Sequence, residues 1–264
     1  MFDRLGWDSS DPKRGRQLEI LVFVLPFLIV AALLTVKFVR PGYYFRLAIR
    51  EDGLFEYLTA IAFLLASIFF LLSWRASRFL GNRFVSFGFL AASVLLFVMF
   101  GEEISWGQRI LGFETPAGMA EANRQGELTL HNLDAVQGNL IYGALSMSFL
   151  GAFGWMIFAS LPSRARDRLA EIGVSRFIPG WFLSSYFLVL FVVFSCMTYL
   201  QGPLISLFGD ALRRGGPYFV SGDQEPTEAI FALGILFFAA FSYSRLKHES
   251  SEEIQADETV SRTA

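Results

Sequence analysis

Six long apolar segments constrain this chain more than any other feature of its sequence. They carry almost no charge and cover residues 18–38, 54–74, 84–101, 139–161, 178–200 and 226–244. A helix needs roughly 20 apolar residues to cross a bilayer. A soluble domain of 264 residues would instead distribute its apolar residues over short periodic stretches. The sequence therefore predicts an all-α, polytopic integral membrane bundle of six transmembrane helices.

The first apolar segment has the position of a signal peptide but not its form. Its apolar run is too long, and no small-x-small cleavage site follows it. We therefore expect a retained transmembrane helix. Because proline removes a backbone donor, we also expect this helix to bend at Pro26.

The distribution of lysine and arginine predicts the orientation of the bundle. Basic residues are dense in the N-terminal segment, in the loops 75–83 and 162–177, and in the tail. They are sparser in the three longer loops. We therefore expect both termini on the cytoplasmic side, with the long loop between the third and fourth helices outside. The exception is the first outer loop, which carries Arg40, Arg46 and Arg50.

The sequence divides into a transmembrane domain at 1–245 and a polar tail at 246–264. The tail is charged and has no apolar period, so we expect it to be disordered and solvated in the cytoplasm. The small size and the basic-inside loops favour a bacterial cytoplasmic (inner) membrane as its location. No basic stripe or nucleic-acid motif occurs, so no nucleic-acid partner is predicted.

The predicted orientation brings the unusual polar residues to the outer side. Acidic residues open the second and sixth helices, two more close the third, and a mixed set precedes the fourth. These residues are Glu51, Asp52 and Glu56; Asp223, Glu225 and Glu228; Glu102 and Glu103; and Glu127, His131 and Asn132. If the helices form one bundle, four loop–helix junctions converge on an acidic site near the outer interface.

Position within a helix separates the acids with an ordinary explanation from the rest. Carboxylates at a helix N-terminus interact favourably with the macrodipole and stabilise the helix by about 0.3–1 kcal/mol each. This effect accounts for Glu51, Asp52 and Glu225 without a function. Glu56 and Glu228 lie about a turn deeper, where a charge is costly and is usually paired or functional.

The stretch GEEISWGQR, residues 101–109, presents the opposite situation. Glu102 and Glu103 follow the C-terminus of a helix, where the dipole disfavours carboxylates, and they repel each other. Three kinds of interaction could compensate for this unfavourable position. Arg109 can pair with Glu102 if the helix continues, because Glu102, Trp106 and Arg109 then share one stripe. The alternatives are a bound cation and a glutamate that stays protonated.

The candidate site combines these groups. The expected catalytic residues are Glu102, Glu103, Glu56, His131 and Glu228, and the expected substrate-binding residues are Trp106, Gln108, Arg109, Asn132 and Glu127. A divalent cation is a further option, with Glu103, His131 and Glu228 as ligands. His131 is the one histidine before the tail, so His₃ and cysteine-type zinc sites are excluded. Mixed Glu/His and all-oxygen metal sites remain open.

Three classes of function fit this pattern. The first is an enzyme, a hydrolase or transferase, that uses acid/base or metal-assisted chemistry on a lipid or lipid-linked headgroup at the extracytoplasmic face. The second is a transporter or flippase with an acidic outer vestibule, and the third is a non-catalytic membrane assembly protein. Membrane lipids are the expected partners in each case. The helix centres carry almost no ionisable residue, which argues against a proton relay.

Overall fold

The computed structural model describes residues 12–48, 53–116, 118, 128–130, 134–200, 203, 206 and 224–263. Every regular element within these ranges is a helix. Six helical stretches are long and apolar enough to cross a membrane: Lys13–Val39, Leu54–Ser77, Arg83–Glu103, Asn139–Ser160, Val174–Leu200 and Gln224–Ser250. The predicted all-α class and the six apolar helices are thereby confirmed, and the fold is compatible with a multi-pass membrane protein.

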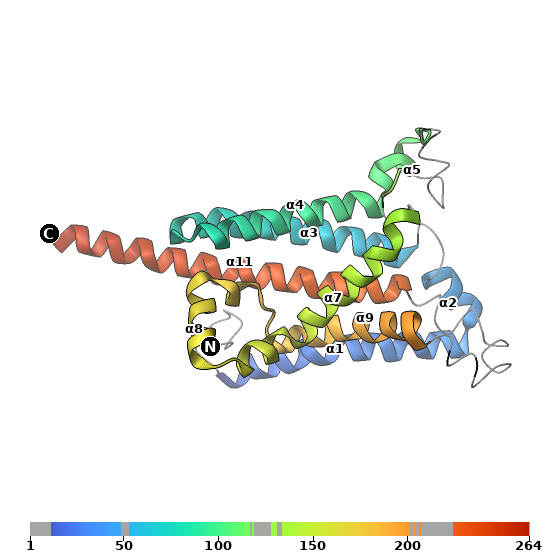
Figure 1. The fold of residues 1–264 in the computed structure, drawn as a ribbon, viewed down its shortest axis with the longest axis horizontal. Helices are drawn as coiled ribbons and strands as arrows, with labels where there is room; N and C mark the ends of the chain where they lie inside the picture. Colours follow the sequence, from blue (N-terminus) through green and yellow to red (C-terminus); the bar gives the residue numbers. More distant parts are fainter. Residues whose placement is uncertain are drawn as a thin grey trace.

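The main helices of the bundle are α1 (Pro12–Val39), α3 (Leu54–Ser77), α4 (Arg83–Glu103), α7 (Asp134–Ser160), α9 (Ser184–Ser195) and α11 (Gln224–Thr263). Most of them run in roughly one direction, whereas α7 runs obliquely to the others (Figure 1). The helix α3 packs against both α4 and α11, while α9 packs against α7, α11 and α1. Helix α1 passes through Pro26 as a single helix.

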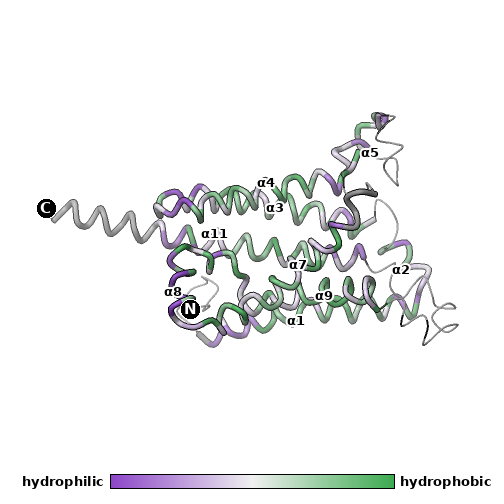
Figure 2. The backbone as a smooth tube through the Cα atoms, in the orientation of Figure 1, coloured by the Kyte–Doolittle hydropathy of each residue, from purple (hydrophilic) through white to green (hydrophobic). Residues whose placement is uncertain are grey.

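Shorter helices lie at the two ends of the bundle (Figure 1). One end has α2 (Pro41–Ala48) and α5 (Gln108–Leu111), and the other has α8 (Ser163–Ile172). Hydropathy follows the same division, because hydrophobic residues dominate the middle of the long helices and α8 is strongly hydrophilic (Figure 2). The bundle thus has an apolar middle and polar ends, as a membrane requires.

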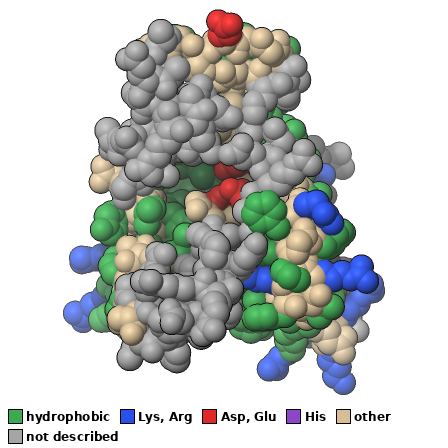
Figure 3. All heavy atoms as spheres, turned by 90° about the vertical axis from the view of Figure 1, so that its right-hand side faces the viewer, with side chains coloured by type: hydrophobic (Ala, Val, Ile, Leu, Met, Phe, Trp, Pro, Cys, Tyr) green, Lys and Arg blue, Asp and Glu red, His purple; other side chains and the backbone are tan. Residues whose placement is uncertain are grey.

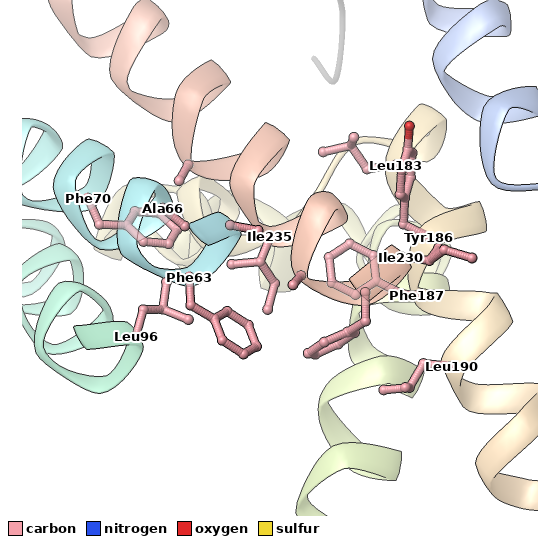
Figure 4. Close-up of a cluster of buried hydrophobic side chains, with 14 of the residues drawn as sticks. Phe63, Ala66, Phe70, Leu96, Leu183, Tyr186, Phe187, Leu190, Ile230 and Ile235 are labelled. Atoms are coloured by element: carbon pink, nitrogen blue, oxygen red, sulfur yellow. The ribbon is translucent and has the colours of Figure 1, made fainter. Parts of the chain in front are cut away.

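The buried core consists of aromatic and aliphatic side chains from α3, α4, α7, α9 and α11 (Figure 4). Between them lie alanines that are almost completely buried, such as Ala66 on α3 and Ala232 and Ala239 on α11. Lipid tails are as apolar as leucine, so helices in a membrane associate through close packing rather than through the hydrophobic effect. Small residues favour that close packing because they allow backbones to approach.

Serine hydroxyls connect α3 to α4 inside this apolar region. Ser67 Oγ donates to the Ser93 carbonyl at 2.8 Å, and Ser93 Oγ donates to the Ser67 carbonyl at 2.9 Å. Nearer the end of the pair, Ser77 Oγ donates to Ser86 Oγ at 3.0 Å. Each of these hydroxyls thus has a hydrogen-bond partner, which reduces the cost of burying a polar group.

Helix α11 extends through most of the segment for which the sequence predicts disorder. It continues to Thr263, and its far end projects beyond the other helices (Figure 1). Leu246 is buried, and Glu249 accepts a hydrogen bond from Arg176 at 2.7 Å. The packed body therefore reaches past residue 245 to Glu249 at least. Glutamate, glutamine and alanine favour helix, which accounts for helical structure where an apolar period is absent.

Gly151 sets the closest approach of α7 to α9. A Cβ atom added there would lie 2.3 Å from Phe187 Cγ, which is too short for any real contact. The Phe187 ring is buried and packs edge-on against Phe231, with a centroid distance of 5.6 Å. Because the ring is held from behind, it has no space to withdraw.

We therefore predict that Gly151→Ala destabilises the protein by about 1–3 kcal/mol through overpacking. Gly143→Ala is the matched control, because Gly143 lies on the same helix with no atom within 4 Å of its added Cβ. There the gain in helix propensity, up to about 1 kcal/mol, is unopposed. Thermal midpoints of both variants in one detergent measure the difference, and equal midpoints would contradict the packing described.

Candidate functional site

The structure brings several of the predicted acids to the same end of the bundle. Helices α3 and α11 begin at this end and α4 finishes there (Figure 1). Glu56 lies in the first turn of α3, Glu102 and Glu103 in the last turn of α4, and Glu228 near the start of α11. Viewed from this end, acidic side chains are visible near the middle of the face, in a recess beside hydrophobic side chains (Figure 3).

Helix α4 ends at Glu103 and does not continue toward Arg109. Ile104 leaves the helical conformation, and Ser105 and Trp106 adopt left-handed backbone angles, with φ of 47° and 52°. Gly107 follows at φ 80°. For residues other than glycine, this conformation costs roughly 1–2 kcal/mol each. The structure therefore replaces the helical stripe of Glu102, Trp106 and Arg109 with a strained turn.

The turn folds Trp106 back onto the end of α4. The indole Nε1–H donates to Glu102 Oε1 at 2.8 Å. The ring lies against the backbone of Gly101, where an added Cβ would be 2.8 Å from Trp106 Cζ3. Gly101 is thus required for the close approach of the ring. Glu102 and Trp106 do meet, as their spacing suggests, but through this turn and not through a continuing helix.

The second oxygen of Glu102 binds a segment that lies far along the chain. Leu130 N–H donates to Glu102 Oε2 at 2.6 Å, and Leu128 N–H donates to Gln108 Oε1 at 2.7 Å. The two side chains thus bind two backbone amides that lie two residues apart, in a segment that bends at Leu128 and Leu130. Thr129, between the two leucines, is 1% exposed.

Gln108 is itself fixed from its other end. Its Nε2 donates to Thr115 Oγ1 at 2.5 Å, so both ends of the side-chain amide are bonded. We refer to Glu102, Trp106 and Gln108, with the segment 128–130 that they hold, as the loop clamp. The clamp ties the end of α4 to both sides of the undescribed stretch 119–127.

The loop clamp explains how a carboxylate is stabilised at the unfavourable end of a helix. One N–H donor reaches each oxygen of Glu102. Hydrogen bonds to a charged group contribute about 1.5–3 kcal/mol each, which exceeds a dipole penalty of about 0.3–1 kcal/mol. This compensation differs from the three expected from the sequence. The side chain of Arg109 lies outside the described residues, so its pairing with Glu102 stays a prediction.

Some of the remaining predicted site residues lie within the described ranges, and others lie outside them. Glu103 is half-buried beside the loop clamp. Glu228 accepts a hydrogen bond from Gln224 Nε2 at 3.0 Å, one turn earlier on α11. Glu127, His131 and Asn132 lie outside the described residues, so their predicted roles are untested. Sequence reasoning missed Leu128 and Leu130, because they contribute backbone N–H groups that no residue type reveals.

The predicted metal site depends on a residue that is not described. Among the residues that the structure does describe, no three histidine, cysteine, aspartate or glutamate side chains form a group that could hold a metal ion. The described acids at this end, Glu56, Glu102, Glu103, Glu225 and Glu228, are therefore not grouped in threes as a metal shell needs. The set of Glu103, His131 and Glu228 stays a prediction because His131 lies outside the described ranges.

Comparison with known proteins assigns no family to this chain. No protein-family model, curated protein or solved structure matches it. The geometry at the acidic end of the bundle is therefore the basis for proposing a function.

The loop clamp predicts a specific change in amide hydrogen exchange. Glu102→Ala removes the acceptor of the Leu130 amide, and Gln108→Ala removes that of Leu128. Loss of a hydrogen bond to a charged group, at about 1.5–3 kcal/mol, should speed exchange at Leu130 by roughly tenfold or more. The neutral acceptor Gln108 should give a smaller effect. Exchange of peptides covering 128–130, followed by mass spectrometry, measures both.

Glu114→Ala is the control for this experiment. Glu114 lies on the same connection and is exposed to solvent. Its removal should leave exchange at 128–130 unchanged. Equal exchange in the wild type and in Glu102→Ala would show that the carboxylate does not hold the segment.

Proposed function

We propose that this chain is a six-span enzyme of a bacterial cytoplasmic membrane that acts on a lipid or lipid-linked headgroup at the extracytoplasmic face. The observation that carries the proposal is the loop clamp. In the loop clamp, the side chains of Glu102 and Gln108 and a strained turn fix a polar connection at the acidic end of the bundle. Strained backbone and preorganised polar groups are typical of catalytic and binding sites.

The contacts of the two adjacent glutamates suggest different roles for them. Both oxygens of Glu102 take part in the loop clamp, so Glu102 is proposed as a positioning residue. Successive residues of a helix point about 100° apart, so Glu103 is directed elsewhere and is proposed as the general acid/base. Glu56 and Glu228 are proposed to complete the acidic site.

The loop clamp also supports a role for the residues that follow it in the sequence. His131 is the next residue after Leu130, whose amide Glu102 holds. His131 is proposed as a second proton-transfer group, and a divalent cation at this end would need it as a ligand beside Glu103 and Glu228. The proposed substrate-binding residues are Trp106, Gln108, Arg109, Glu127 and Asn132.

The charge of the two bundle ends supports the proposed orientation. The end opposite the loop clamp bears α8, which carries Arg164, Arg166 and Arg168 (Figure 1). Arg75, in the last turn of α3, and Arg83, at the start of α4, lie at this end too. Lysine and arginine are enriched on the cytoplasmic side of membrane proteins. The acidic end is therefore assigned to the extracytoplasmic side.

The packed interior favours an enzyme over a transporter. A substrate path through the bundle needs polar or ionisable groups near the midplane. Within the described core, stacked and edge-on phenylalanines such as Phe70 and Phe89 fill the space between α3 and α4. The hydroxyls of Ser67 and Ser93 at the same interface bond to each other's carbonyls. Chemistry confined to one end fits this interior better than passage through it.

The proposal predicts that Glu103→Gln abolishes a change in membrane lipids. Loss of a general acid/base lowers a rate by roughly 10²–10⁴-fold. Cells that lack the gene and carry Glu103→Gln should therefore match the lipid profile of cells with no gene, with the product reduced about a hundredfold. Quantitative mass spectrometry of lipids and lipid-linked species measures this, and Glu114→Gln should restore the normal profile.

Two results would contradict the proposal. One is a wild-type lipid profile with Glu103→Gln, which would remove this residue from the chemistry. The other is an unchanged profile when the gene is deleted, which would favour a non-enzymatic role.

The orientation is checked separately in a Cys196→Ser background. A cysteine at position 114 should react with an impermeant maleimide in intact cells, and one at position 163 only after lysis.

A further inference from the structure

A groove at the junction of α1 and α2 lies apart from the acidic site. It has a volume of about 280 Å³ and is lined by Thr35, Val36, Val39, Arg40 and Tyr43. Thr35, Val36 and Val39 lie in the last turns of α1, Tyr43 lies in the first turn of α2, and Arg40 lies between the two helices. None of them is among the residues of the proposed active site. We call this feature the α1–α2 groove. It requires an explanation separate from that of the acidic site.

Pro41 creates this junction. Arg40 N–H still bonds to the Val36 carbonyl at 2.8 Å, as in a continuing helix. Pro41 has no N–H and disfavours helical angles in the residue before it, so α1 ends here. The Arg40 carbonyl then accepts from the amides of Tyr43 and Tyr44 at 2.9 and 3.0 Å, which starts α2. Arg40 thus occupies the corner between the two helices.

The two basic residues of this junction, Lys37 and Arg40, have different surroundings on α2. Its Tyr44 is buried over Lys37, with the ammonium nitrogen 5.4 Å from the ring centroid. Tyr43 is 51% exposed and faces the groove with Arg40. Arg40 is exposed, and among the described residues its guanidinium has no hydrogen bond or ion pair. Arg40 therefore places a cation, with no partner in the described part of the chain, at the edge of an apolar groove.

The surface around the groove is suited to lipid chains. Val39 is 71% exposed and Phe38 is 65% exposed, both at the end of a helix long and apolar enough to span a membrane. The Thr35 hydroxyl donates to the Ala31 carbonyl at 2.8 Å, so its hydrogen is used within α1. Tyrosine is enriched at the level of lipid headgroups. Arginine binds phosphate through several donors at once.

We propose that the α1–α2 groove binds one phospholipid of the adjacent leaflet. The phosphate is bound by the Arg40 guanidinium near the Tyr43 hydroxyl, and an acyl chain lies along Val36 and Val39. The site does not depend on the proposed enzyme, nor on which leaflet it faces. In the proposed orientation it also explains why Arg40 is on the outer side, against the usual distribution of basic residues: its charge is matched by a lipid phosphate.

Native mass spectrometry of the purified full-length protein, titrated with palmitoyl-oleoyl phosphatidylglycerol, tests the site. Arg40→Ala should weaken binding of the first lipid by about tenfold, as expected for loss of a hydrogen-bonded charge. Arg46→Ala is the matched control, since Arg46 is also exposed on α2 but does not line the groove. It should bind as the wild type does. Val36→Trp should fill the groove and reduce binding while keeping the charge.

Several outcomes would overturn the proposal. Unchanged binding by both Arg40→Ala and Val36→Trp would exclude the groove, and an equal loss in Arg46→Ala would indicate general attraction to surface charge. A diacylglycerol without phosphate should bind much more weakly than phosphatidylglycerol, and equal binding would remove the role of Arg40. Inorganic phosphate should not displace the lipid, because displacement would indicate a simple anion site. If Arg40→Ala lowers the thermal midpoint, Val36→Trp alone decides.

Discussion

Hydrocarbon offers no hydrogen-bond partner, so every polar group that enters it must be satisfied by the protein itself. The apolar helices meet this requirement through their own backbones. Several hydroxyls within them also bond to carbonyls, as Thr59 does to Phe55 and Ser73 to Phe69 one turn earlier. Ser67 and Ser93 do so across the interface of α3 and α4. Among the described residues, four buried polar groups have no such partner: Trp155 Nε1, Ser185 Oγ, the Tyr186 hydroxyl and Ser242 Oγ. The clusters of acidic and basic residues lie at the ends of the bundle.

The two ends meet the same constraint with different chemistry. At the basic end, Arg176 on the segment before α9 bonds to Glu249 and fixes the continuation of α11. At the acidic end, Glu102 binds an indole N–H and a backbone amide, while Gln108 holds a second amide two residues away. The strain at Ser105 and Trp106 is offset by these bonds. This combination of strain and fixed polar groups is the basis for proposing an active site there.

The sequence predicts the features that local pattern determines. The apolar run from Leu54 predicts the start of α3. The sequence also places Glu102 and Glu103 at the C-terminal end of a helix, and α4 does end at Glu103. The spacing of Glu102 and Trp106 indicates a contact, and the structure makes one. A helix period, however, implies a continuing helix, and the left-handed angles at Ser105 and Trp106 are not visible in residue type.

Features that depend on distant parts of the chain were beyond sequence reasoning. Leu128 and Leu130 reach the loop clamp through backbone amides, which are the same in every residue except proline. The extension of α11 beyond residue 245 is stabilised by the Arg176–Glu249 pair, whose partners lie 73 residues apart. The α1–α2 groove likewise requires the direction of α2 after Pro41, which accompanies contacts of α2 with both α1 and α3.

The most direct measurement of the central claim is an experimental structure of the full chain in lipid nanodiscs that resolves residues 101–130. We expect α4 to end at Glu103, and the Glu102 carboxylate to lie between the Trp106 indole and the Leu130 amide. A helix continuing from Arg83 through Arg109, with Glu102 facing Arg109 and the Leu130 amide elsewhere, would contradict this expectation.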